Sequence, residues 1–503
     1  MFDDRLTRID AQTLRVNHPS QIPISLFANQ RVPIERQALD ELWQMLELVE
    51  TLERWHGVAP DDFARQPQIT RVALTPDFHK AQGVPVGTVV QTNGFYVPQA
   101  IGGDINCGMR LHVTALNAEQ LEGKKDALEM ALRRRFFEGG RDIAMTGLQR
   151  QALLQGGLEG LANAVPASQQ QGLWRAWHEQ SGSLERTMNR GSLIARSVAG
   201  LEDFIGNLHA LSRDAQIGSI GGGNHFVEIQ RVSRILEPVT AHAWGLKLGA
   251  VVVRVHSGSL SIGQRCGALI KRLVRDAYPT TLKHPANGLY PLPLGEAHQS
   301  TLQTVRDALH AAANFAFANR LFLALMARDA LEAVVSETGF ELLYDAPHNF
   351  CWLDGETALH RKGATPSRGY SEMQDTPFAY HGEPVLVPGS MGAASCVLAG
   401  SGRADALWSA SHGAGRLRSR GTAMRVDDRE FEAFMERFTV VTPLDLRDPH
   451  VKSRPDIVID KLLELKQEAP FAYKDIAPVI DTLTGAGMAR GVAMLEPLLT
   501  VKG

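Results

Sequence analysis

The feature that most constrains the fold is a series of short β-branched runs after residue 217, each ending in a polar or glycine-rich cluster. These runs are FVEIQ, AVVVRVH, ELLYDAPH and PVLVPGS, and segments of helical length lie among them at 262–277 and 297–336. Short apolar runs bounded by turn residues are typical of buried strands. Chemistry tends to lie at strand ends, because a rigid sheet positions the loops that follow. The pattern predicts an α+β fold with mixed sheets and flanking helices.

The rest of the chain contains no repeat, low-complexity tract or linker. Residues 36–55 carry apolar residues at helical spacing, which predicts an amphipathic helix. The stretch RVALTPDFHK predicts a strand that ends at Pro76. Residues 117–213 are rich in Gln, Arg and Glu and predict a mostly helical elaboration. We therefore expect one large domain over residues 1–503.

The charge balance limits the partners that the chain can bind. Lys and Arg number 52 and Asp and Glu 55, giving a net charge of −3, so the surface is not globally basic. Any polyanion must be bound by a local cluster of Arg and Lys. The start, MFDDRL, does not resemble a secretion signal. The alanine-rich run 308–335 is broken by Asn314, Arg320, Arg328 and Asp329. We therefore expect no membrane span, and we expect a cytoplasmic location.

Three histidines stand at the ends of predicted strands. His225 lies in GGGNHFVEIQ, His256 in VVVRVHSGS and His348 in LLYDAPHNF. We expect all three at the same edge of a sheet. A buried histidine bonded to the backbone is the alternative for any one of them, but three in the same context favour a shared site.

Asp104 and Cys107, in the glycine-flanked segment GGDINCG, complete a mixed set of donors. A metal ion in a protein takes about four ligands, so one carboxylate, one thiol and three imidazoles are enough to hold two ions with a bridging thiolate. These donors suit Mn, Zn, Fe or Co. Cys107 also has a simpler interpretation, as a small buried apolar residue. The four cysteines of the chain are too few for a disulfide framework.

Three glycine-rich loops are typical of anion binding, because their backbone N–H groups can surround a phosphate. They lie at 218–225, 387–395 and 409–416. His412, in SASHGAGR, does not follow an apolar strand, so it suits a nucleophile or an acid/base better than a ligand. The segment RLRSR (416–420) is either a phosphate-binding cluster or a solvated helix face.

Taken together, these segments resemble the RtcB family of RNA-splicing ligases. The motifs that carry the resemblance are PDFHKAQGVPVGTVV, IGGDINCGMR, IGSIGGGNHFVEIQ, HSGS, HNF, HRKGAT, PVLVPGSMGAAS, SHGAGR and the tail AYKD…LTVKG. They run in family order from about residue 70 to the last residue, so the resemblance covers most of the chain.

The resemblance implies joining of RNA that ends in a 2′,3′-cyclic phosphate or 3′-phosphate to RNA with a 5′-OH. In the family, a histidine attacks GTP with two Mn²⁺ assisting and becomes guanylylated. The GMP then passes to the RNA 3′-phosphate, and the 5′-OH displaces it. Archease is a possible activating partner.

The resemblance also assigns roles to individual residues. The implied metal ligands are Asp104, Cys107, His225, His256 and His348. The implied guanylylated nucleophile is His412. The implied GMP site comprises Asn224, His225, Phe226, Val227, Glu228, His348, Asn349, Pro388, Gly389, Ser390, Met391, Ser395, His412, Gly413, Ala414, Gly415, Tyr473 and Lys502. The implied phosphate or RNA contacts are Arg416 and Arg420. Asp77 and His79, in PDFHK, are weaker candidates for supporting the site.

Two positions depart from the family pattern. Leu260, in HSGSL, and Pro366, after HRKGAT, stand where arginines are common in the family. Loss of phosphate contacts weakens nucleic-acid binding, so we expect RNA to be held less tightly or elsewhere. Alternatives are a guanylyltransferase that caps 3′-phosphate ends without sealing, a non-catalytic RNA-binding paralogue, and a dinuclear metallohydrolase. The last explains neither His412 nor the tail.

Overall fold

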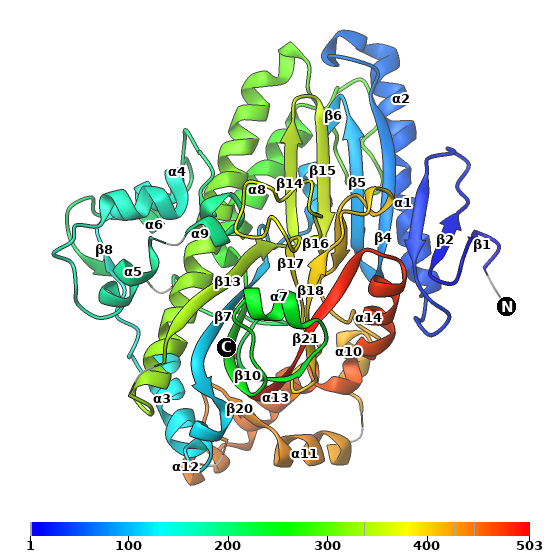
Figure 1. Cartoon of the computed structure of the whole chain (residues 1–503). Helices are drawn as coiled ribbons and strands as arrows, with labels where there is room; N and C mark the ends of the chain where they lie inside the picture. Colours follow the sequence, from blue (N-terminus) through cyan, green and yellow to red (C-terminus); the bar gives the residue numbers. More distant parts are fainter. Residues whose placement is uncertain (1–2, 183, 215, 337, 427, 447) are drawn as a thin grey trace.

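Two sheets and one long buried helix organise the protein (Figure 1). The structure, a computed structural model, describes residues 3–182, 184–214, 216–336, 338–426, 428–446 and 448–503. Its mixture of sheets and helices confirms the predicted α+β class.

The first sheet contains the N-terminal strands. Its order is β1 (Leu6–Arg8), β2 (Thr13–Val16), β3 (Ile24–Phe27), β4 (Gln68–Gln82), β5 (Val84–Asn93), β15 (Thr357–Lys362) and β14 (Asn349–Asp354). All neighbours in it are antiparallel except β3 and β4. Helices α1 (Arg36–Leu46) and α2 (Leu48–Val58) pack against it.

The second sheet carries the predicted strands that end in histidine. Its order is β13 (Phe340–Pro347), β7 (Gly108–Asn117), β11 (Ala250–Ser257), β10 (Phe226–Ile235), β21 (Ala489–Val501), β18 (Ser395–Gly400) and β17 (Pro384–Val387), with β20 (Thr439–Val441) paired to β21. Three small sheets pair β12 (Leu292–Pro293) with β6 (Phe95–Tyr96), β16 (Ala364–Pro366) with β19 (Ser409–Ser411), and β8 (Ala144–Met145) with β9 (Ser212–Arg213).

Helix α9 (Gln299–Glu332) packs against β11 and β7 of the second sheet and forms the centre of the core. By length and composition it could cross a membrane, with a window of mean hydropathy 1.2. However, 94% of that window is buried inside the protein. Burial against sheet and helices accounts for its apolar composition. Helices α4 (Gly147–Ala164) and α8 (Leu260–Asp276) flank it.

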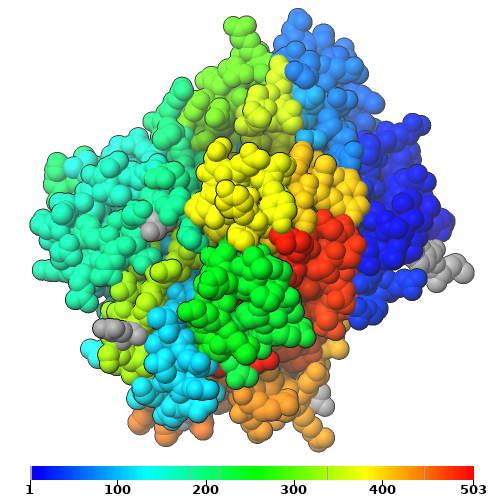
Figure 2. Space-filling view, in the orientation of Figure 1, coloured from blue at the N-terminus to red at the C-terminus, as the bar shows by residue number. Residues whose placement is uncertain are grey.

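The remaining helices surround this core. They are α3 (Lys125–Phe137), α5 (Trp174–Gln180), α6 (Glu202–Ile205), α7 (Pro238–Ala243), α10 (Arg420–Ala423), α11 (Asp428–Arg437), α12 (Pro449–Lys452), α13 (Pro455–Lys466) and α14 (Ile476–Gly485). The predicted elaboration at 117–213 contains α3 to α6, and much of it, coloured teal, forms the protrusion on the left of the molecule in Figure 2.

Two predicted element boundaries were wrong. The single helix expected at 36–55 is two helices that meet at Glu47. The strand expected to end at Pro76 continues as β4 to Gln82, and its pairing with β5 is irregular between Leu74 and His79. Proline has no N–H to donate to the ladder, so the strand passes it as an irregularity rather than stopping there.

Candidate active site

Four neighbouring strands of the second sheet place the predicted ligands at one edge. Cys107 precedes the first residue of β7, His225 precedes β10, His348 follows β13, and His256 lies next to the end of β11. In the ladder, His256 is paired with both Phe226 and Met109. The expectation that the three histidines share a sheet edge is therefore confirmed.

The five predicted metal ligands meet in one cluster. Cys107 Sγ lies 3.1 Å from His256 Nε2 and 3.3 Å from His225 Nε2. His348 Nε2 lies 3.4 Å from His256 Nε2. Asp104 Oδ2 lies 2.8 Å from His225 Nε2. The sulfur and the nitrogens of His225 and His256 all lie within 4.8 Å of one another, as ligands of a shared metal ion do.

Backbone contacts orient the two central imidazoles. His225 Nδ1 donates to the carbonyl oxygen of Ile220 at 3.0 Å, and His256 Nδ1 donates to that of Asn224 at 3.0 Å. Each Nε2 therefore turns its lone pair toward the cluster, an arrangement typical of metal-binding histidines. His225 Nε2 then faces the Asp104 carboxylate at 2.8 Å, so a nitrogen and an oxygen donor lie close enough to share one cation. The donor set thus fits a metal.

The thiol of Cys107 fits the same interpretation. Burial, followed by the negative charge of Asp104, raises the pKa of this thiol well above its usual range. A metal ion reverses that effect, because a coordinated cysteine binds as the thiolate.

Two polar residues of α9 hold the ligand-bearing segments in place. Arg320 donates to the carbonyl oxygens of Asn106 at 2.7 Å and Ser257 at 3.1 Å, and it forms an ion pair with Asp345 at 2.9 Å. Asn319 Nδ2 donates to Ser257 Oγ at 3.0 Å. Because Asn106 adjoins Cys107, Ser257 adjoins His256 and Asp345 precedes His348, one guanidinium bonds to three of these segments.

Two glycines permit the close packing of these segments. A Cβ atom on Gly108 would lie 2.5 Å from the carbonyl oxygen of Ala346, and one on Gly258 would lie 2.3 Å from Asp104 Oδ1. A larger residue at either position would therefore displace a segment that carries a candidate ligand.

His412 lies directly beside the cluster, with its ring centroid 4.7 Å from that of His348. Its Nδ1 donates to Asp77 Oδ2 at 2.6 Å, and Thr75 donates to the other carboxylate oxygen at 2.5 Å. No hydrogen bond occupies its Nε2 among the described residues. Burial opposes ionisation of Asp77, but the charge and hydrogen bond of His412 outweigh it and lower the pKa of Asp77. This geometry leaves Nε2 free to act as a nucleophile.

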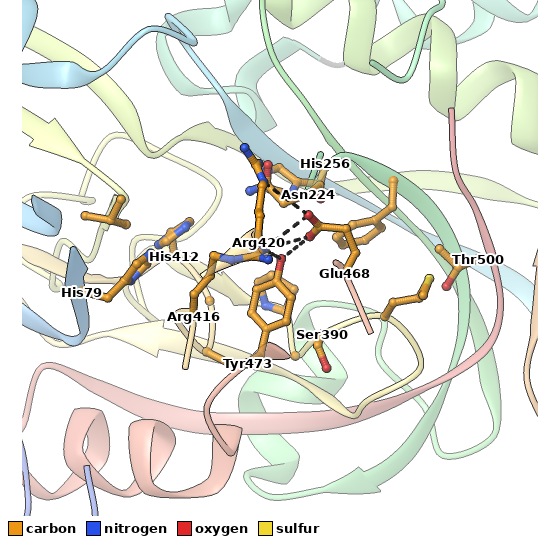
Figure 3. A pocket seen from close by; sticks show the side chains of 18 of the residues that line it. His79, Asn224, His256, Ser390, His412, Arg416, Arg420, Glu468, Tyr473 and Thr500 are labelled. Carbon is orange, nitrogen blue, oxygen red and sulfur yellow. Dashed lines mark hydrogen bonds and ion pairs between the residues drawn. The ribbon is translucent and has the colours of Figure 1, made fainter. Parts of the chain in front are cut away.

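A cavity opens beside His412 (Figure 3). Its volume of about 130 Å³ is below the range of roughly 300–1,000 Å³ typical of small-molecule sites. Arg416, Glu468 and Tyr473 gather within it and take up part of the space. The residues implied by the resemblance that line it are Asn224, Phe226, His256, Pro388, Gly389, Ser390, Met391, His412, Gly413, Ala414, Gly415, Arg416, Arg420, Tyr473 and Lys502.

Six residues of the implied GMP site do not line the cavity: His225, Val227, Glu228, His348, Asn349 and Ser395. His225 and His348 lie in the donor cluster instead. Val227 follows Phe226 on β10, and successive side chains of a strand point to opposite faces. Asn349 accepts from the N–H of Gly363 at 2.7 Å. Ser395 Oγ accepts from the N–H of Gly389 at 3.3 Å and so lies behind the glycine-rich loop.

Glu228 lies beneath the cavity rather than in its wall. Thr500, which does line the cavity, donates to one oxygen of Glu228 at 2.6 Å, and Gln230 donates to the other at 2.6 Å. Burial raises the pKa of Glu228 to about 7. The carboxyl is therefore one layer removed from any ligand in the cavity.

Lys502 reaches the cavity from the end of β21. Its ammonium donates to the carbonyl oxygen of His225 at 2.7 Å and to that of Gly223. Burial lowers the pKa of Lys502 to about 8. The tail lysine is thus held in the interior, where it secures the loop that carries a metal ligand.

Three cavity residues, Val86, Thr500 and Glu468, were missed by the sequence analysis. Thr500 stands two residues before Lys502, and the two-residue period of a strand could have placed both on one face. No sequence pattern indicated that Glu468 belongs to the site, apart from its position close to the AYKD motif. Its carboxylate lies 3.3 Å from Arg416 Nη1 and 3.9 Å from Arg420 Nε, and Tyr473 donates to it.

The two departures from the family pattern occupy different surroundings. Leu260 starts α8 in a left-handed conformation (φ 50°), and its side chain faces Gly221 of the glycine-rich loop. Pro366 is buried in β16, where it pairs with Ser409. Leu260 therefore borders the metal cluster, whereas Pro366 is enclosed within the fold.

Comparison with known proteins finds relatives that match most of the chain. A family model described as tRNA-splicing ligase RtcB matches residues 61–503. The chain belongs to the RtcB family. It is 34% identical to the RNA-splicing ligase RtcB of Mycobacterium bovis over 459 residues, which cover 88% of this chain and 99% of that protein. It is 32% identical to the tRNA-splicing ligase RtcB of Thermococcus kodakarensis over 501 residues, which cover 94% and 95% of the two chains.

Membership in the RtcB family confirms the resemblance drawn from the motifs. The matched lengths mean that these RtcB relatives and this chain correspond over nearly their whole sequences. The metal cluster, His412 and the cavity all lie within the part matched by the RtcB model.

Proposed function

We propose that this protein is a GTP- and Mn²⁺-dependent RNA ligase that works through a guanylylated histidine. The observation that carries the proposal is His412, which bonds to Asp77 through Nδ1, has a free Nε2, and lies between the five-residue cluster and a cavity. The names of the relatives, RNA-splicing and tRNA-splicing ligase, support RNA as the substrate.

The cluster would hold two Mn²⁺ ions. Its oxygen, sulfur and nitrogen donors suit this metal, and the ligands would be Asp104, Cys107, His225, His256 and His348. Two divalent ions supply charge neutralisation at the phosphates and align the reacting groups.

His412 would be the nucleophile in the first step. Its Nε2 attacks the α-phosphorus of GTP, a phosphorus–nitrogen bond forms, and the bond to the leaving pyrophosphate breaks. The proton on Nδ1 remains bonded to Asp77, whose negative charge stabilises the positive charge that develops on the ring. Arg416, Arg420 and the glycine-rich loops would contact phosphate, and Tyr473 and Lys502 would lie near the guanine.

Two further transfers would complete the reaction. An oxygen of the RNA 3′-phosphate, supplied directly or after opening of a 2′,3′-cyclic phosphate, attacks the phosphorus on His412 and releases the imidazole. The 5′-OH of the second RNA then attacks the activated 3′-phosphate, a phosphodiester forms, and GMP leaves. We place this activity in RNA repair or tRNA splicing in the cytoplasm, with archease as a possible activator.

Incubation with Mn²⁺ and GTP labelled at the α-phosphate tests the first step. We expect label on the wild-type protein and none on His412→Ala. A chase with RNA carrying 3′-phosphate and 5′-OH ends should transfer the label to RNA, release it as GMP and give a joined product. Wild-type protein that takes up no label would refute the proposal.

Leu260 is the one observation that favours a second function, the capping of 3′-phosphate ends without sealing. This apolar side chain borders the metal cluster where a cation would aid RNA phosphate binding. A guanylyltransferase that caps 3′-phosphate ends without sealing would label both protein and RNA in the same experiment, but it would give no joined product.

A further inference from the structure

Helix α8 leads directly away from the metal cluster. The N–H of Ser259, immediately before α8, donates to Asp104 Oδ1 at 3.1 Å, and Leu260 at its first position faces Gly221. The side chain of Asp104 is 30% exposed, whereas that of His225 is 8% exposed. Asp104, which the start of α8 contacts, is therefore the more exposed of these two candidate ligands.

The exposed surface of α8 is strongly basic. Its 17 residues contain four exposed cations, Arg265, Lys271, Arg272 and Arg275, against one carboxylate, Asp276. The whole chain, in contrast, has a net charge of −3. This is the kind of local basic cluster that the charge balance requires of any polyanion-binding site.

Three of these four cations form no ion pair with any residue that the structure describes. Arg265 lies 3.2 Å from Asp203 in an exposed ion pair, which contributes little stability. In the part of the chain that the structure describes, Lys271, Arg272 and Arg275 form no ion pair. Their charges are therefore not used to hold the fold together.

A groove of about 400 Å³ runs beside α8. One wall is the segment 199–201 of the helical elaboration. On the α8 side, Cys266 and Leu269 supply apolar lining between Arg265 and Arg272. The residues that line it are Ala199, Gly200, Leu201, Arg265, Cys266, Ala268, Leu269 and Arg272. Arg265 and Arg272 are seven positions apart and so lie about 10 Å from each other along one helix face.

We propose that this groove binds the sugar–phosphate backbone of an RNA strand whose end reaches the metal cluster. The inference rests on the proposed ligase function and deepens it. Arg265 stands about 8 Å along the helix from Leu260, so the first phosphate contact is displaced by one to two turns from the position where the family commonly has an arginine. Arg272 lies about 10 Å farther along. RNA is favoured over a protein partner because α8 starts beside Ser259, which bonds to Asp104 of the cluster, and the exposed cations follow along the same helix.

The proposal also gives the 117–213 region a role. Segment 199–201 forms one wall of the groove, and α4 and α6 of the same region pack near α9 and each other. The elaboration would then extend the substrate path, with α8 as the opposite wall.

The test compares two triple variants with the same change in charge. The groove variant is Arg265→Gln, Arg272→Gln and Arg275→Gln; the first two residues line the groove, and Arg275 lies about one turn beyond Arg272 on the exposed surface. The matched control removes three exposed cations at the start and in the body of α3, Lys124→Gln, Lys125→Gln and Arg134→Gln. Binding of a single-stranded RNA with a 3′-phosphate is measured between 50 and 200 mM salt, without GTP.

We expect the groove variant to bind RNA about tenfold more weakly at the lower salt. The slope of log K against log salt should fall by about 2, because each phosphate contact on a single strand contributes roughly 0.7. The control should follow the wild type. A groove variant with the wild-type affinity and slope, or a control that weakens equally, would overturn the proposal.

Labelling with GTP keeps this proposal separate from the proposed function. Both triple variants should take up label from GTP like the wild type, since neither touches the cluster or the cavity. Loss of labelling in the wild type refutes the ligase function whatever the RNA binding. A photoreactive base near the RNA 3′ end should crosslink to peptides from α8 or 199–201, and crosslinks confined to other surfaces would overturn the groove assignment.

Discussion

Arg320 and Asp345 form an ion pair at 2.9 Å in which both side chains are fully buried. The guanidinium comes from the middle of α9, and the carboxylate comes from β13, three residues before His348. The same guanidinium bonds to the carbonyl beside Cys107 and to the carbonyl beside His256. The metal-binding edge is therefore held by the protein itself.

Replacing Arg320 tests this positioning. We expect Arg320→Met to weaken Mn²⁺ binding by about 10- to 100-fold, as loss of groups that orient metal ligands does. It should also reduce the free energy of unfolding by about 1–3 kcal/mol, because the buried carbonyls of Asn106 and Ser257 lose their donor. Asp345 keeps its second buried partner, Arg110, at 3.1 Å. Titration calorimetry and denaturant unfolding measure the two effects. Arg328→Met, on the same helix but partly exposed, is the control and should leave Mn²⁺ affinity unchanged.

Cys107 is expected to be a ligand rather than a packing residue. Cys107→Ser should reduce bound Mn²⁺ and guanylylation together, because a hydroxyl does not replace a bridging thiolate. Metal analysis of the purified protein measures the first effect. Cys396→Ser, a buried cysteine in β18, should keep both properties. A Cys107→Ser protein with its full metal content would show that the thiol only packs.

Asp77 is expected to act through His412. Asp77→Asn removes the negative charge that stabilises the ring during attack, and we expect guanylylation to slow by about 100-fold. Mn²⁺ binding should not change, since Asp77 is not in the metal cluster. Single-turnover labelling with GTP measures the rate. Equal losses of rate and of Mn²⁺ content would instead point to a general structural defect.

Lys502 is expected to matter for the nucleotide site more than for the fold. Lys502→Met keeps the length of the side chain but removes the ammonium that bonds to the carbonyls of Gly223 and His225. Guanylylation should be lost while the thermal midpoint changes little, because burial of a charged lysine is itself costly. Lys461→Met, which removes the bond to the carbonyl of Gly503, is the neighbouring control.

Glu228 gives the fold a defined pH dependence. Its pKa is raised from 4.5 to about 7 in the folded protein, chiefly by burial, so the folded state holds an extra proton between these values. Its contribution is fully present below pH 4.5 and is lost as pH rises through 7. The loss amounts to about 3 kcal/mol.

The variant Glu228→Gln should remove this component. Denaturant unfolding at several pH values between 4.5 and 8 should show a shallower decline in the variant than in the wild type. Glu496→Gln, at an exposed ion pair with Arg231, should follow the wild type. Parallel curves for Glu228→Gln and the wild type would contradict the assignment.

The cluster of candidate metal ligands could be predicted from the sequence, because its histidines share a local sequence pattern. His225, His256 and His348 each adjoin an apolar run, and antiparallel pairing of neighbouring strands then carries them to one edge. The glycine-rich loops likewise predicted residues that line the cavity. Both patterns involve residues that are neighbours in the chain, so they can be recognised in a single sequence.

Contacts made across the fold left no such signal. Glu468 lines the cavity just after the end of α13, and nothing in its sequence neighbours indicates that its carboxylate meets Arg416. The sequence did not predict that Arg320 positions the candidate ligands. In an alanine-rich helix, a single arginine indicates only that the apolar run is broken. Glu228 was placed in the nucleotide site, yet tertiary packing puts Thr500 between it and the cavity.

The ligands of the cluster come from residues as far apart as 104 and 348, and they meet only once β13, β7, β11 and β10 have paired. Pairing of such distant strands is slow compared with the folding of local structure. If the cluster binds the proposed ions, it can do so only after the sheet has formed. Chelation should then leave a folded, metal-free protein that can be refilled.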